Sequence, residues 1–218
     1  MKKILFLLCG MLIWIVIAGV ANAALLDRGN GLIYDNDLDI TWLQDTNYAM
    51  TSGYDLDGMM IWDEAMAWAD QLEYGGFTEW RLPSTSTPVS IQGCNITSSE
   101  MGHLYYEELN NLGIRGIDGS FPQAGYGLTN TSFFINLQPK DYWSSTDVYY
   151  NDAMRAWLFS FSGGVQTAAA LKSNTLFAMA VHNGDIGAPV PEPSTIFLFS
   201  SGLLGLAGVS RKNNSINK

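Results

Sequence analysis

Residues 24–188, which we call the body of the chain, contain three side chains of the types that most often bind metals or act as nucleophiles, namely Cys94, His103 and His182. They lie far apart in the sequence and lack the spacing of metal ligands. The hydroxyl-rich run at 142–146 has no obvious base, and the carboxylate pair at 63–64 is explained by the dipole of the helix that it begins. The sequence therefore predicts a protein with no catalytic residues that is not an enzyme and needs no cofactor.

Alternating aspartates offer hard oxygen ligands for calcium at two places. They are Asp35, Asp37 and Asp39 in one turn and Asp55 and Asp57 in another. The first set alternates like the start of an EF-hand loop, but Ile40 stands where that loop needs glycine and no glutamate occupies the twelfth position. Aspartate is also common in solvated turns. Calcium sites and plain turns therefore both stay open.

Aromatic side chains point to a different kind of site, in which sugar rings stack on exposed aromatic rings. The body of the chain has six tryptophans, which fall on the apolar faces of predicted elements. We expect most of them to be buried and one or two at most to line a surface site. The tyrosines of predicted loops are better candidates, and these are Tyr48, Tyr54, Tyr126, Tyr149 and Tyr150.

The elements that must position these residues are short strands at both ends of the body, with helices between them. We expect strands at 31–34, 40–44, 142–146, 154–161, 165–170 and 176–182, with a turn at 35–39. Apolar spacing predicts a helix over 61–74 that stops at Gly75. A second helix over 100–112 should have Ser99 as its cap and Gly113 as its stop.

The pattern as a whole predicts an α+β fold with two helices and a small, mainly antiparallel sheet whose terminal strands pair. Residues 24–188 have the length of one domain with room for a real core. They hold six basic and twenty acidic residues, a net charge of −14. Such a surface repels phosphate, so nucleic acid is excluded as a partner, whereas cations and neutral sugars are compatible. Cys94 has no partner for an internal disulfide there.

The residues at the N-terminal end predict that the protein is exported. A basic start at Lys2 and Lys3 is followed by an apolar run over 4–20, and Ala21 and Ala23 provide the small residues that signal peptidase requires. We expect residues 1–23 to be a signal peptide.

The C-terminal end, 189–218, combines a proline strip with an apolar run. Prolines hold the strip extended and withhold backbone donors. The apolar helix expected over 196–210 is shorter than the roughly 20 residues that span a bilayer comfortably. The basic tail over 211–218 fits the cytoplasmic side if the body lies outside.

This order of parts resembles the PEP-CTERM sorting signal of Gram-negative bacteria that make exopolysaccharide, with its motif at 190–195. The resemblance implies recognition of Pro191, Glu192 and Pro193 by an exosortase, an integral-membrane transpeptidase that removes or exchanges the tail. The precursor would be anchored in the inner membrane transiently and would end on the outer surface or in the extracellular matrix. A plain membrane anchor on a periplasmic domain is the alternative.

The body carries a second resemblance, over about 31–185. Four segments, 38–45, 62–72, 75–83 and 142–146, resemble the Lcl C-terminal domain family, and the middle two are the specific part. That family is similar to the C-type-lectin-like and formylglycine-generating-enzyme group, which implies a C-type-lectin-like fold. Its named member binds glycosaminoglycans, so surface binding is implied more than chemistry, although the charge of −14 opposes a polyanion ligand.

Together these features predict an exported, exosortase-sorted surface or matrix protein, a binding or structural component associated with exopolysaccharide, with carbohydrate as its ligand class. The second resemblance also leaves open a formylglycine-generating-enzyme-like oxidase or another metal-dependent enzyme.

Overall fold

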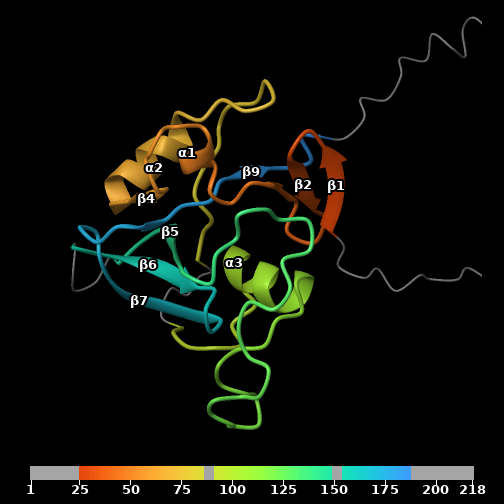
Figure 1. The fold of residues 1–218 in the computed structure, drawn as a ribbon, viewed down its shortest axis with the longest axis vertical. Coiled ribbons are helices and arrows are strands. Elements are labelled where there is room, and N and C mark those ends of the chain that lie inside the picture. Colours follow the sequence, from red (N-terminus) through yellow and green to blue (C-terminus); the bar gives the residue numbers. More distant parts are fainter. Residues whose placement is uncertain (1–24, 86–90, 149–153, 188–218) are drawn as a thin grey trace, which may run out of the picture.

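Two β-sheets form the framework, and one extended segment near the end of the chain belongs to both. The computed structural model describes residues 25–85, 91–148 and 154–187 (Figure 1). The first sheet has the order β1 (Leu25–Gly29), β2 (Leu32–Asp35), β3 (Ile40–Leu43) and β9 (Val181–Asn183). The second has the order β4 (Met59–Met60), β8 (Leu176–Phe177), β5 (Asp141–Asp147), β6 (Arg155–Ser160) and β7 (Val165–Leu171).

The first sheet brings the two ends of the described chain together. The predicted hairpin is confirmed, since β2 and β3 pair antiparallel across the turn at 35–39. Strand β9 then pairs with β3, so that Trp42 faces Val181 in the register. This confirms that the terminal strands pair. Strand β1 was not predicted, and it adds a further antiparallel partner at the edge of β2.

The segment at 176–183 leaves the second sheet and enters the first. Phe177 in β8 pairs parallel with Tyr142, and four residues later β9 begins. The strand predicted at 176–182 is therefore divided, because its two ends serve different sheets. Its centre is fully buried and alternates between two hydrophobic clusters, with Ala178 and Ala180 in one and Met179 and Val181 in the other. This alternation is the two-residue period of an extended chain.

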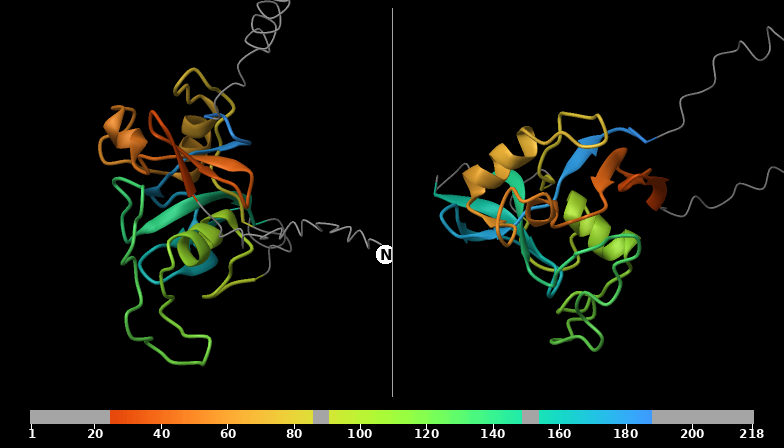
Figure 2. Two further views of the ribbon diagram at one scale, coloured as in Figure 1. Left: turned by 90° about the vertical axis from the view of Figure 1, so that its right-hand side faces the viewer. Right: turned by 45° about the horizontal axis from the view of Figure 1, so that its top comes forward.

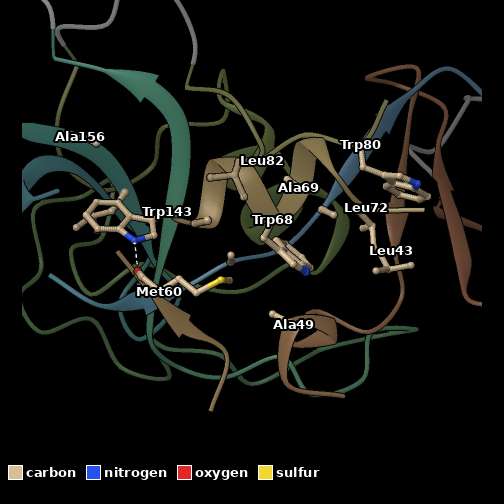
Figure 3. Packing of buried hydrophobic residues seen from close by; sticks show 14 of the residues in the cluster. Leu43, Ala49, Met60, Trp68, Ala69, Leu72, Trp80, Leu82, Trp143 and Ala156 are labelled. Carbon is tan, nitrogen blue, oxygen red and sulfur yellow. Dashed lines mark hydrogen bonds between the residues drawn. The ribbon is translucent and has the colours of Figure 1, made fainter. Parts of the chain in front are cut away.

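Tryptophans dominate the first cluster, which lies between α2 (Trp62–Asp70) and the second sheet. Figure 3 shows Trp68, Trp80 and Trp143 within it, and the Trp143 indole N–H donates to the Met60 carbonyl at 2.8 Å. Five of the six tryptophans are buried and Trp62 is half-buried, which confirms the expected core role.

Three α-helices are present in the described chain where two were expected. The unpredicted one is α1 (Tyr48–Thr51), a single turn. Helix α2 ends at Asp70, before the predicted 74, because Tyr74 instead pairs with Phe77 across a tight turn. Gly75 and Gly76 in that turn have φ of 62° and 85°, a conformation that glycine adopts without strain.

The second predicted helix is also shorter than 100–112. It consists of α3 (Glu100–His103) and a π-helical turn, η1 (Leu104–Glu108). Ser99 is its cap, as predicted, and accepts a hydrogen bond from the Gly102 N–H at 3.1 Å. Asn110 rather than Gly113 takes a left-handed conformation beyond its end, with φ of 50°. Leu112 is then free to pair with Gly127.

The two further views in Figure 2 show the same mixed arrangement of helices and mainly antiparallel sheets. Within residues 25–85, 91–148 and 154–187, none of the helices has the length and apolar character needed to cross a bilayer. The predicted leader with Ala21 and Ala23, the sorting tail with Pro191, Glu192 and Pro193, and the tyrosines at 149 and 150 lie outside the described residues.

Replacing Ala180 by leucine should destabilise the protein, because the larger side chain must enter a fully buried position between two sheets. We expect the free energy of unfolding in urea to fall by about 1–3 kcal/mol. The exposed Ala169 of β7 provides the matched control, for which Ala169→Leu should change stability by less than about 0.5 kcal/mol. Equal losses of stability in the two variants would contradict the conclusion that the segment at 176–183 is tightly packed between the two sheets.

Candidate functional site

An open cavity of about 310 Å³ brings together two of the five tyrosines proposed for stacking, Tyr48 and Tyr54. It lies between α1, the end of α2 and the loop at 52–58. Its lining residues are Tyr48, Ser52, Tyr54, Trp68, Gln71, Leu72 and Glu73. We call it the aromatic cavity. Tyr126 does not line it and stands in the irregular segment after η1, where it is 41% exposed.

The rings of the aromatic cavity are held by their neighbours. Tyr48 begins α1 and meets Tyr74 edge to face at 5.1 Å between ring centroids. Tyr74 in turn packs edge to face on Trp80. Trp68 is buried and points from α2 toward α1 (Figure 3). Tyr54 is 51% exposed, so it can offer its ring to a ligand while the others form a fixed wall.

The loop beside this cavity is shaped by the aspartates proposed above as calcium ligands. The Asp55 carboxylate accepts hydrogen bonds from the backbone N–H groups of Asp57 and Gly58, at 3.0 and 2.7 Å. Asp57 likewise accepts from the Met59 N–H at 2.9 Å. Both aspartates therefore shape the loop by accepting backbone hydrogen bonds, and calcium binding there stays a prediction.

Gly58 closes the same loop against Asn47. Its φ is 80°, and a Cβ added there would lie 1.7 Å from the Asn47 side-chain oxygen. Only glycine fits this approach. The Asn47 side chain also donates to the Asp57 carbonyl at 3.3 Å. The close packing of loop and α1 fixes the position of Tyr54 at the rim of the cavity.

The polar groups of the aromatic cavity are neutral or acidic. Ser52, Gln71 and Glu73 provide them, and none of the described lining residues is basic. Two other cavities, of about 330 and 400 Å³, lie against the second sheet and contain no tyrosine or tryptophan. The aromatic cavity differs from these two in combining tyrosine and tryptophan rings with hydrogen-bonding groups.

The first aspartate turn does not gather its three carboxylates. Asp35 is fully buried, and it accepts hydrogen bonds from the Leu38 N–H at 3.1 Å and the Trp42 indole N–H at 3.3 Å. Asp37 and Asp39 are exposed, and Asp39 accepts from the Tyr34 hydroxyl. A calcium site shared by the three stays a prediction, but the side chain of Asp35 has other neighbours.

Those neighbours are His103 and Glu108, and with Asp35 they form what we call the His103 cluster. The His103 Nε2 atom lies 3.3 Å from a Glu108 oxygen and 3.9 Å from an Asp35 oxygen. Burial raises the pKa of both carboxyl groups, and the nearby Asp35 raises that of Glu108 further. Sequence reasoning missed this cluster because 68 residues separate Asp35 from His103. Neither Cys94 nor His182 belongs to it.

Comparisons with known proteins add two matches. The family model described as the Lcl C-terminal domain matches residues 31–182. The model described as the PEP-CTERM protein-sorting motif matches residues 189–212. No curated protein and no solved structure matches the chain.

Replacing Asp55 by alanine should loosen the loop that carries Tyr54, because two backbone N–H groups lose their acceptor. We expect the free energy of unfolding to fall by about 1 kcal/mol at pH 7, measured by urea unfolding with a calcium chelator present. Asp37→Ala, in a similar exposed turn, should cost less than about 0.5 kcal/mol. An equal effect of the two substitutions would contradict this role.

The same contribution should depend on pH. Partial burial opposes the charged form of Asp55, but the N–H groups of Asp57 and Gly58 outweigh it and lower the pKa of the carboxyl below its ordinary 3.8. The stabilisation is therefore present above pH 3.8 and is lost as the pH falls through the lower folded value. The difference in the free energy of unfolding between the wild type and Asp55→Ala, measured by urea unfolding, should shrink as the pH falls over that range.

Proposed function

Because this chain belongs to the Lcl C-terminal domain family and continues into a PEP-CTERM sorting motif, we propose that it binds exopolysaccharide at the cell surface or in the matrix, without catalysing a reaction. The motif indicates an exported protein whose sorting depends on an exosortase and which is anchored in the membrane at the cell surface. The observation that carries the binding role is the aromatic cavity, with Tyr54 exposed at its rim.

The composition of this cavity supports a sugar ligand. Small-molecule sites are typically concave and mostly apolar, with a few polar groups that orient the ligand, and they start at about 300 Å³. A volume of about 310 Å³ suits one or two sugar units of a longer chain. The faces of Tyr48 and Tyr54 offer stacking surface, and Ser52, Gln71 and Glu73 offer hydrogen bonds to hydroxyl groups.

Charge favours a neutral polysaccharide over an anionic one. Residues 24–188 carry a net charge of −14, and the described lining of the cavity contains no cation. A polyanion would meet repulsion both at long range and at the site. Neutral sugars are not affected by this field.

The position of the cavity also suits a protein that is tethered by its C-terminus. Gly187 ends the described chain beside Arg28, and Arg28 pairs with Asp185 there through a 3.0 Å hydrogen bond. The helices α1 and α2, which carry the cavity, lie across β9 from the β1–β2 hairpin (Figure 1). The described chain therefore ends on the hairpin side, across β9 from the helices that carry the cavity.

We further assign the fold to the C-type-lectin-like group. Support comes from the pairing of terminal strands and from the helix followed by Arg81, Leu82 and Pro83. Arg81 binds the Glu100 carboxylate with two hydrogen bonds, of 2.8 and 2.7 Å, which ties this segment to α3.

Loss of the exosortase should leave the C-terminal tail on the protein. Intact-mass measurement of the exported protein should show removal of the tail in the parent strain and its retention in the exosortase mutant. The Glu192→Ala protein should keep its tail in both strains. The Pro189→Ala protein, altered in the same proline strip, should lose its tail in the parent strain as the unaltered protein does. A tail retained in both strains by the unaltered protein would instead indicate a plain membrane anchor.

Tyr54→Ala should weaken binding of neutral exopolysaccharide at least tenfold, because the exposed stacking surface of the cavity is lost. Purified neutral exopolysaccharide fragments and a glycan array, each with and without calcium, provide the measurement. Tyr126→Ala removes another exposed loop tyrosine, 41% exposed and outside the cavity, and should leave the affinity unchanged. Equal affinity of the two variants, or binding that disappears at high salt, would contradict a neutral sugar site at this cavity.

A further inference from the structure

We propose that Asp35, His103 and Glu108 bind a divalent transition-metal ion, Zn²⁺ in the first place, in a site that joins the β2 strand to the π-helical turn. This site is separate from the aromatic cavity and shares none of its residues. It also goes beyond the proposed sugar binding, since neither depends on the other.

The geometry is close to that of a three-ligand zinc site. One ligand atom from each residue lies within 4.8 Å of the others. The distances from His103 Nε2 are 3.3 Å to Glu108 and 3.9 Å to Asp35. Zinc bonds of 2.0–2.2 Å in a tetrahedron place neighbouring ligand atoms about 3.4 Å apart. Small side-chain shifts would therefore bring all three atoms to bonding distance.

Burial of its two carboxylates makes a positive charge in the cluster favourable. The side chain of Asp35 is fully buried and that of Glu108 is 2% exposed. Within the described part of the chain, His103 is the hydrogen-bond partner of the Glu108 carboxylate, and their contact is long at 3.3 Å. Two buried carboxylates side by side are costly unless a positive charge lies between them. A bound metal ion meets that requirement.

The π-helical turn places two of the ligands, His103 and Glu108, on the same side of the helix. Residues five apart in an α-helix are rotated by about 140° because each turn takes 3.6 residues. In η1 the Leu109 N–H instead donates to the Leu104 carbonyl, five residues earlier, at 2.9 Å. This wider turn returns Glu108 to the face of His103. Single π-helical turns are frequent at functional sites.

The chemistry of the ligands selects the kind of metal. An imidazole nitrogen with two carboxylate oxygens suits zinc and related transition metals, whereas calcium takes six to eight oxygen ligands. The His103 side chain is 13% exposed, which leaves a path for the ion and a position for water as fourth ligand. The backbone N–H groups of Asp37 and Leu38 donate to Asp35 Oδ1, the oxygen that faces His103, at 3.2 and 3.1 Å, and so fix the orientation of this carboxylate.

The test is metal analysis and titration of the full-length protein in detergent. Elemental analysis after addition of zinc and gel filtration should find one zinc ion per chain, and calorimetry should give a single site. Glu108→Gln and His103→Gln should each weaken zinc binding at least tenfold. His182→Gln removes the other described histidine, which meets Trp80 edge to face, and this variant should bind zinc as the parent does. No Asp35 variant is used, because the Asp35 carboxylate also stabilises the turn at 35–39 by accepting backbone hydrogen bonds.

Cobalt provides a readout that needs no variant. Co²⁺ bound to the unaltered protein should give the intense visible absorption of a tetrahedral site, and zinc should displace it. Substoichiometric zinc, absence of this cobalt spectrum, or equal losses in His103→Gln and His182→Gln would overturn the proposal. Binding of calcium in preference to zinc would overturn the choice of metal.

Discussion

The structure depends on the burial of one extended segment, 177–181, between two hydrophobic clusters. Ala178 and Ala180 face the tryptophan-rich cluster beneath α2, and Met179 and Val181 face the cluster that contains Trp42. Because all four are fully buried, the segment can neither twist nor slip by one residue without exchanging its two faces. The small side chains on one side let the helix and the sheet approach closely.

A network of charged and polar side chains holds helix α3 against the first sheet. The Arg81 guanidinium binds Glu100 and also donates to the Asn183 side-chain oxygen at 2.7 Å. Glu100 accepts in addition from the Ser84 N–H at 2.6 Å. One side chain therefore joins α3 to β9, and the start of α3 has a fixed place beside the first sheet. This placement is what brings His103 and Glu108 to Asp35.

The two candidate sites differ in how they are built. The aromatic cavity uses residues from 48 to 73, so a short stretch of chain and its own turns suffice to shape it. The His103 cluster draws on a strand and a helix that are distant in sequence, and it exists only when the first sheet and α3 are packed together. Sugar binding and metal binding would accordingly respond to different perturbations, the first to local changes in the loop at 52–58 and the second to changes in packing.

Local features could be predicted because they depend on near neighbours in the chain. Turn chemistry predicted the β2–β3 hairpin, and Ser99 was identified as a helix cap. The proline strip before an apolar run predicted the sorting motif that the family comparison matches at 189–212. Periodicity could not show that Tyr74 would leave its helix to pair with Phe77, or that one predicted strand would serve two sheets. Only the tertiary structure placed Tyr48 and Tyr54 in one cavity apart from Tyr126, and Asp35 beside His103, because long-range packing sets these distances and local sequence preferences do not.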